Sequence, residues 1–254
     1  MLRYNLGANS DIGIGRKLQE DFISYKEYDN DLFAVIADGT GTSDDRLQPA
    51  VVATNSMINE ITAIKEENDE LFKKDPMFFL KRAMLNANSI LGIMKISNEE
   101  LYHGYAASMS AIYFSSEGRM YFVHAGNTRI YLLRDGRLTQ MTEDHTVAMQ
   151  RVNEGELSMD HYYLTEDRLK VTSGVGINTE PEIYTLSGNI KPNDIFVMTT
   201  DGIHYALTPQ NMVEVILNSD GVVDAAEKLV YAAKNFVQYP DNMAAFVIGA
   251  GEVQ

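Results

Sequence analysis

Three aspartates of this 254-residue chain stand where an apolar segment meets a loop. Asp38 and Asp201 each end an apolar run and precede a glycine, and Asp241 comes just before the last apolar run. A carboxylate there is unfavourable to bury unless it is paired or bound to a metal, and hard divalent cations prefer oxygen ligands. A following glycine would let the backbone turn sharply and present its carbonyl oxygen. The three aspartates are therefore candidate ligands for a divalent cation.

Two simpler explanations exist for these carboxylates. Asp-Gly after a strand is common turn chemistry on its own. The formal net charge is −15, and acidic stretches such as KEENDE at 65–70 are typical of solvated helix faces that keep a protein in solution. Charge counts do not separate these explanations from a metal site, so the order of further motifs must decide.

Composition excludes several classes of function. The chain has no cysteine, which excludes disulfides, thiolate metal sites and cysteine nucleophiles. Its negative charge would repel nucleic acid, and its 21 Lys and Arg residues form no dense cluster. We find no apolar run of about 18 residues and no signal-peptide core, so we expect a cytoplasmic protein without a membrane or nucleic-acid partner.

The hydrophobic pattern predicts one α+β domain over residues 1–254, since no repeat or linker divides it. The expected strands are 22–28, 32–38, 106–114, 119–125, 128–134, 194–202 and 242–251, and the expected helices are 45–67, 76–97, 209–218 and 222–237. Pro76 would lie in the first turn of the second helix. Tight turns at 116–118, 126–127 and 135–136 predict an antiparallel meander. This order is typical of helical pairs covering antiparallel sheets.

Six motifs in sequence order resemble those of the metal-dependent, type 2C (PPM-type) Ser/Thr protein phosphatases, bacterial members included. The first is SDIGIGRKLQED at 10–21, which is similar to the family's S-D-x-G-x-x-R-x-x-N-[QE]-D. The others are VIADGTG at 35–41, AGNTRIYLLRDGRLTQMTEDHT at 125–146, VNEGELS with VTSGVG at 152–176, MTTDGIHYALT at 198–208 and DNMAAFVI at 241–248. Each motif alone is weak, but their common order is specific.

The resemblance implies an αββα sandwich with a binuclear Mn²⁺ or Mg²⁺ centre at one end of the sheets. It assigns metal ligands to the Asp38 carboxylate, which would bridge both ions, and to Asp201, Asp241, Glu20 and the carbonyl of Gly39. Asp21 would hold a metal-bound water, and Arg16 would clamp the phosphate with its planar fork. A flap would occupy roughly 147–190.

Metal-assisted hydrolysis suits these residue types. A phosphate monoester dianion resists attack by an anion, so two cations would lower the pKa of a water, orient it and offset charge on the transferring group. No covalent intermediate is needed, which agrees with the lack of cysteine. His145 resembles a motif residue that holds the flap near the site, and no other histidine has metal-ligand spacing with a second one.

Two positions depart from the family's pattern. Asn127 stands where the family's G-D-S-R motif has the aspartate that contributes to a third, weaker metal site, and an amide oxygen brings no charge to a cation. The loop from Thr40 to Asp45 has Thr42 in place of glycine and lacks the usual histidine. We expect two ions, with a doubtful third site, and an altered approach surface.

The sequence favours a phosphatase that acts on phosphoserine or phosphothreonine in proteins and opposes a Ser/Thr kinase. Asn127 and the loop from Thr40 leave open a non-catalytic or weakly active module that binds phosphoproteins. A hydrolase of small phosphate esters would share every site residue and stays open as well.

Overall fold

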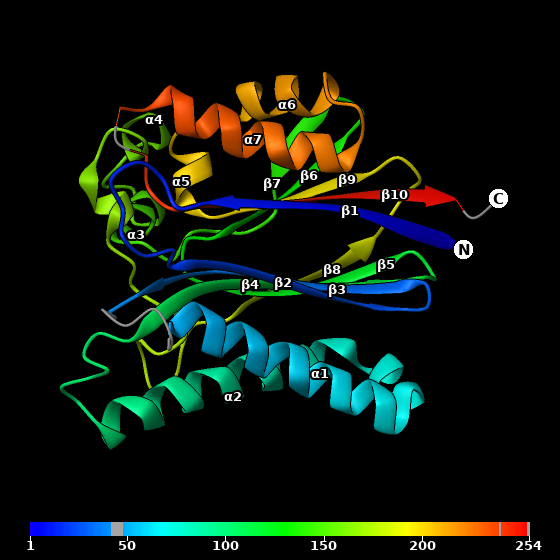
Figure 1. The fold of residues 1–254 in the computed structure, drawn as a ribbon, viewed down its shortest axis with the longest axis horizontal. Coiled ribbons are helices and arrows are strands. Elements are labelled where there is room, and N and C mark those ends of the chain that lie inside the picture. The colour runs from blue at the N-terminus through cyan, green and yellow to red at the C-terminus, as the bar shows by residue number, and fades with distance from the viewer. Residues whose placement is uncertain (42–47, 239, 253–254) are drawn as a thin grey trace.

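Two five-stranded antiparallel sheets lie face to face between two pairs of helices (Figure 1). This is a computed structural model, and it describes residues 1–41, 48–238 and 240–252. The architecture confirms the predicted αββα sandwich.

The first sheet contains, in spatial order, β2 (Asp21–Tyr28), β3 (Asp31–Thr40), β4 (Ala106–Ser115), β5 (Arg119–Ala125) and β8 (Tyr184–Asn189). The second contains β1 (Leu2–Asp11), β10 (Met243–Glu252), β9 (Ile195–Thr199), β6 (Arg129–Arg134) and β7 (Arg137–Gln140). Helices α1 (Pro49–Lys74) and α2 (Pro76–Ser97) cover the first sheet, and α6 (Pro209–Leu217) and α7 (Val222–Phe236) cover the second. The short helices α3 (Val147–Asn153), α4 (Met159–Tyr162) and α5 (Asp201–His204) and the 3-10 helix η1 (Glu166–Leu169) lie toward one end.

Strand alternation decides which way the strand-borne carboxylates point. The odd-numbered residues of β3 from 33 to 37 pack against α1 and α2, whereas the even-numbered residues from 32 to 36 pack between the sheets. Successive side chains of a strand alternate between faces. Asp38 continues the even series and therefore faces the space between the sheets. Asp21 does the same in β2, because it shares the parity of Ile23, which packs between the sheets.

The predicted meander through residues 126–127 is wrong. β5 pairs with β4 and β8, whereas β6 pairs with β7 and β9 in the other sheet, so the chain crosses between sheets at this point. Gly126 has a φ of +117°, and a Cβ there would lie 2.4 Å from the side chain of Ser108. The Gly-Asn pair has the composition of a hairpin turn, but here it serves a crossover. The predicted turn at Asp135-Gly136 does join a hairpin, β6 to β7.

The helices largely follow the predictions. α2 begins at Pro76, and the side chain of Asp75 accepts a hydrogen bond from the Phe78 N–H at 3.0 Å. α1 begins at Pro49, and its backbone leaves helical geometry at Asn68, directly after the predicted end at 67, before a further helical stretch continues to Lys74. Residues 42–47 lie outside the described part. The predicted flap is too long, since 184–189 form β8. Among the helices of the described ranges, none combines the length and apolar composition that a membrane-spanning segment requires.

Candidate active site

A cleft of about 590 Å³ opens at one end of the sandwich and brings the predicted site residues together. They come from the loop after β1, from β2 and β3, from the start of α5 and from the segment before β10. The cleft is lined by all seven predicted residues, Arg16, Glu20, Asp21, Asp38, Gly39, Asp201 and Asp241.

The pairing of β2 with β3 sets two carboxylates side by side. Asp21 and Asp38 are direct partners in the antiparallel register, and directly opposed residues project from the same face. The hydroxyl of Thr200, which follows β9, donates a 2.6 Å hydrogen bond to Asp21 from the opposite sheet. The Thr200 N–H also bonds the carbonyl of Ala244 in β10 at 3.1 Å. Sequence patterns did not reveal this role of Thr200, since its partner lies 179 positions away.

The glycines after Asp38 and Asp201 do not make the sharp turns predicted for them. Neither has a positive φ, and Gly39 is still part of β3. Their role is to permit close approach: a Cβ on Gly39 would lie 3.1 Å from the Glu20 carbonyl oxygen, and one on Gly202 would lie 2.0 Å from the Asn242 carbonyl oxygen. Both glycines thus let neighbouring segments press against the carboxylates.

Asn242 forms hydrogen bonds with the loop between β1 and β2, a role that the sequence did not reveal. Its Oδ1 accepts a hydrogen bond from the Glu20 N–H at 2.8 Å, and its Nδ2 donates to the carbonyls of Ile12 at 2.7 Å and Leu18 at 3.0 Å. Its own N–H donates to Asp241 Oδ1 at 2.8 Å. Asn242 therefore holds the backbone of Glu20 through its side chain and the Asp241 carboxylate through its own backbone N–H, and the only sequence signal was its place in the D-N-M motif.

Arg16 reaches the carboxylates from the same loop. Its guanidinium forms a 2.5 Å ion pair with Asp241, and both side chains are about half exposed. The pair puts the fork of Arg16 at the open side of the cleft, within reach of an anion entering from solvent.

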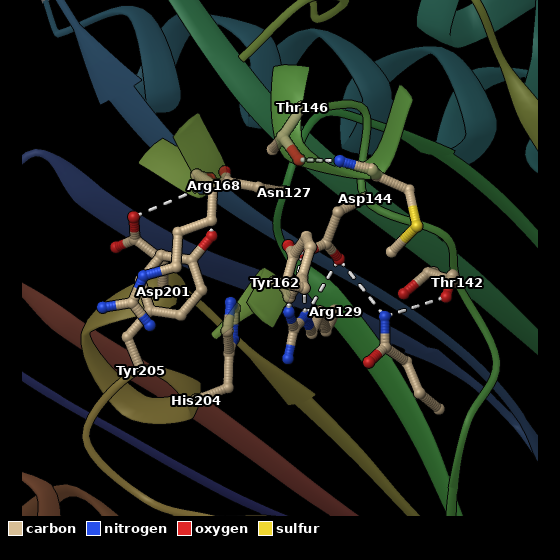
Figure 2. A network of polar contacts seen from close by, with 12 residues as sticks. Asn127, Arg129, Thr142, Asp144, Thr146, Tyr162, Arg168, Asp201, His204 and Tyr205 are labelled. Carbon is tan, nitrogen blue, oxygen red and sulfur yellow. Dashed lines mark hydrogen bonds and ion pairs between the residues drawn. The ribbon is translucent and has the colours of Figure 1, made fainter. Parts of the chain in front are cut away.

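Asn127 is buried and forms hydrogen bonds within the site, in addition to lacking the charge of an aspartate. Its side chain is 3% exposed, and its Nδ2 donates a 3.2 Å hydrogen bond to Asp201 Oδ2 (Figure 2). Its N–H bonds the hydroxyl of Ser108 at 3.2 Å, and the neighbouring Gly126 exchanges hydrogen bonds with His145. The Oδ1 atom of Asn127 is buried in the cleft wall, and no hydrogen-bond partner for it is found among the described residues. The amide thus orients Asp201 where an aspartate would repel it.

A buried polar network joins the flap to the sheets (Figure 2). Arg129 of β6 donates to both oxygens of Asp144, at 2.9 and 2.7 Å, and the hydroxyl of Tyr162 in α4 donates to Asp144 as well. The guanidinium of Arg168 in η1 lies 4.3 Å from the ring centre of Tyr205, which follows α5. These contacts hold η1 and α4 against the helix that begins with a site aspartate.

His145 also ties the flap to the site. Its N–H donates to the Gly126 carbonyl at 2.7 Å, and its carbonyl accepts from the Thr172 N–H at 2.8 Å. His145 does not line the cleft. This agrees with its predicted role of holding the flap near the site.

The carboxylates perturb one another strongly. Burial, and then the charges of Asp201, Asp21, Asp241 and Glu20, raise the pKa of Asp38 well above its usual value. The pKa of Asp21 is also raised well above its usual value, mainly by burial, although the Thr200 hydrogen bond opposes this. Burial and Asp241 raise the pKa of Asp201 to about 6, against the hydrogen bonds from Asn127 and from the Gly202 N–H. The cluster therefore carries more negative charge than its surroundings balance.

A divalent cation fits this donor set. Among the described residues, no cation or hydrogen-bond donor pairs with the Asp38 carboxylate, and only Arg16 forms an ion pair with any member of the cluster. Within the same described residues, no three His, Cys, Asp or Glu side chains converge closely enough to hold one ion. An ion would therefore need backbone or solvent oxygens in addition, which is usual for Mg²⁺.

Known proteins resemble this chain in sequence. The serine/threonine protein phosphatase PstP of Mycobacterium tuberculosis is 27% identical over 234 residues, which are 92% of this chain and 42% of that protein. The serine/threonine phosphatase stp of Listeria welshimeri is 20% identical over 217 residues, 84% of this chain and 82% of that protein. No family model matches the sequence. The chain thus spans less than half the length of PstP.

Solved structures share the fold. The crystal structure of M. tuberculosis PstP/Ppp superposes with a TM-score of 0.82 at 26% identity, covering 99% of both chains. The catalytic domain of PstP in complex with two manganese ions superposes with a TM-score of 0.80 at 24% identity, covering 99% of this chain and all of that one.

Proposed function

We propose that this chain, whose motifs and fold are those of the bacterial type 2C Ser/Thr protein phosphatases, is a metal-dependent phosphatase of phosphoserine and phosphothreonine in proteins. The observation that carries the proposal is the convergence of five carboxylates from four segments of the chain in one cleft, where Arg16 is the only arginine of the described residues that pairs with one of them. Gathering so much negative charge in a partly buried cleft is unfavourable unless cations complete it.

The proposed ligands are the predicted ones. Asp38, Asp201, Asp241, Glu20 and the Gly39 carbonyl would together hold two Mn²⁺ or Mg²⁺ ions, and solvent oxygens would complete each ion, because no three carboxylates of the described residues converge on one point. When bound, such ions activate water and offset the charge on a transferring phosphoryl group. The catalytic domain of PstP, which was solved with two manganese ions, supports a metal-dependent function for this fold.

The side chains of the chain supply binding and orientation. Arg16 would bind the phosphate, because its fork matches two phosphate oxygens and it already faces the open side of the cleft. Asp21, fixed by Thr200, would accept a hydrogen bond from a water in the cleft and hold it toward the phosphate. Its strand partner Asp38 keeps it at the centre of the cluster.

The contacts of Asn127 support catalysis over a binding module. Asn127 donates to Asp201, so it helps to hold a proposed ligand in place. The other motivation for the binding module was the loop from Thr40, and residues 42–45 of that loop lie outside the described part. A hydrolase of small phosphate esters would use the same cleft, and the substrates in the test separate it from a protein phosphatase.

The test is hydrolysis of p-nitrophenyl phosphate and of a phosphothreonine peptide across a Mn²⁺ titration. We expect metal-dependent turnover of both, abolished in Asp38→Asn and Asp201→Asn and retained in Asp224→Asn, a surface carboxylate on α7 that pairs with Lys228. Turnover of p-nitrophenyl phosphate alone would favour the small-ester hydrolase. A folded protein without metal-dependent turnover would favour the binding module.

Three further predictions belong to this proposal. We propose that residues 1–254 form one domain of this type, that the protein acts in the cytoplasm, and that its substrates are phosphorylated by a Ser/Thr kinase. Comparing the phosphoproteome of cells with and without the protein tests the last of these.

A further inference from the structure

Part of the cleft lining is apolar. Leu169, at the end of η1, and Ile177 line the cleft together with Val171, and the proposed metal ligands line the same cleft. Leu169 is 53% exposed and Ile177 is 39% exposed, so both present apolar surface to whatever enters. These three residues are called the apolar wall below.

Helix α2 fixes part of this wall. The Oδ1 of Asn88 accepts from the Gly176 N–H at 2.7 Å, and its Nδ2 donates to the carbonyls of residues 178 and 179, each at 3.1 Å. Lys95 of the same helix donates to the Gly176 carbonyl. Asn88 is buried, and a buried side chain with its hydrogen bonds satisfied holds its partners in one geometry.

The sheet fixes the same segment from the other side. Val175 is fully buried and exchanges two backbone hydrogen bonds with Ala107 of β4, at 2.8 and 2.9 Å. Gly176 has a φ of +83°, and a Cβ there would lie 2.8 Å from the Tyr105 carbonyl oxygen. Ile177 is therefore displayed on a backbone held by both a helix and a strand, which makes its position in the cleft reproducible.

We propose that the apolar wall is a specificity site that binds an apolar side chain directly beside the phosphorylated residue of an extended protein segment. The proposal rests on the proposed function for the identity of the phosphorylated group. The wall and the carboxylates share one cleft of about 590 Å³, larger than a phosphate needs and of the size that holds a drug-sized ligand. A segment with its phosphate at Arg16 would cover Ile177 and Leu169 and remove apolar surface from water.

The test uses binding, so that it does not depend on turnover. The probes are labelled peptides with a non-hydrolysable phosphonate analogue of phosphothreonine, flanked on both sides by Leu, Asp or Lys, and fluorescence anisotropy gives their Kd values in Mn²⁺. We expect the Leu peptide to bind about tenfold more tightly than the Asp or Lys peptide. Ile177→Ala and Leu169→Ala should each reduce that preference several-fold. Ile93→Ala removes a more exposed isoleucine of α2 outside the cleft and should not reduce the preference.

The outcomes separate this inference from the proposed function. Equal binding of the three peptides, tighter binding of the Lys peptide, or a preference that survives both wall substitutions would overturn the apolar wall, whether or not the protein hydrolyses p-nitrophenyl phosphate. A Leu preference that depends on Ile177, in a protein without phosphatase activity, would support the wall and overturn the function.

Discussion

Replacing Asn127 by aspartate is the sharpest single test of how the site is built. In the native chain Asn127 Nδ2 donates to Asp201 Oδ2 across 3.2 Å. Asn127→Asp keeps the shape of the side chain but puts a carboxylate oxygen where the donor was. In the absence of metal the two carboxylates must repel or share a proton.

The size of the effect follows from the pKa of Asp201. At an effective dielectric constant of about 20, two full charges 3.2 Å apart would repel by about 5 kcal/mol. Protonating Asp201 costs less than this repulsion, because the pKa of Asp201 is already raised to about 6. At pH 7 the proton must then be bound one pH unit above the pKa, which costs about 1.4 kcal/mol. The shared proton replaces the lost hydrogen bond. The metal-free variant should therefore lose about 1.4 kcal/mol, a Tm about 3–6 °C lower.

Added Mn²⁺ should reverse this loss of stability. A bound cation offsets the new charge and releases the proton, so Mn²⁺ should raise the Tm of Asn127→Asp by more than it raises the Tm of the native protein. In the millimolar range, the variant should also respond at a lower Mn²⁺ concentration than the native protein. The assay is thermal unfolding at pH 7 in chelator and across a Mn²⁺ titration. Asn127→Ala is the control, because it loses the hydrogen bond without adding charge. Its Mn²⁺-dependent rise in Tm should be no larger than that of the native protein. Equal Mn²⁺ responses in the three proteins would refute the reasoning.

Three other substitutions test the surrounding structure. Burial lowers the pKa of His124 to about 3, so below about pH 6.5 the unfolded chain takes up a proton at this histidine that the folded chain does not. His124 should therefore lower the free energy of unfolding by about 1.4 kcal/mol for each pH unit below about 6.5. Urea unfolding between about pH 7 and pH 5 should show a smaller loss of stability in His124→Gln than in the native protein. Asp144→Asn leaves Arg129 buried beside a neutral amide and should reduce the free energy of unfolding by about 3–5 kcal/mol, and a loss below about 1 kcal/mol would contradict a structural role for the pair. Gly202→Ala forces a Cβ to within 2.0 Å of the Asn242 carbonyl oxygen, so Mn²⁺-dependent stabilisation should weaken, and an unchanged Mn²⁺ response would show that the clash is absorbed elsewhere.

The sequence by itself determined the local features of this protein. Alternation in β3 and β2 fixed the face from which Asp38 and Asp21 project, because the side-chain direction of a strand repeats every two residues. Pro76 marked the start of α2, and Asp135-Gly136 marked a hairpin, because helix starts and turns depend on a few adjacent residues. The seven predicted site residues were found in order through motifs, and the cleft contains them all.

Only the tertiary structure decided which distant groups meet. The turn at Gly126-Asn127 looks like the one at Asp135-Gly136, yet it carries the chain to the other sheet, because strand pairing depends on partners far along the chain. For the same reason the sequence could not show that Asn127 donates to Asp201, or that Asn88 of α2 holds the loop bearing Ile177. Motifs carry residue types and spacing, whereas hydrogen bonds across 70 to 90 positions exist only once the two sheets and their helices have packed.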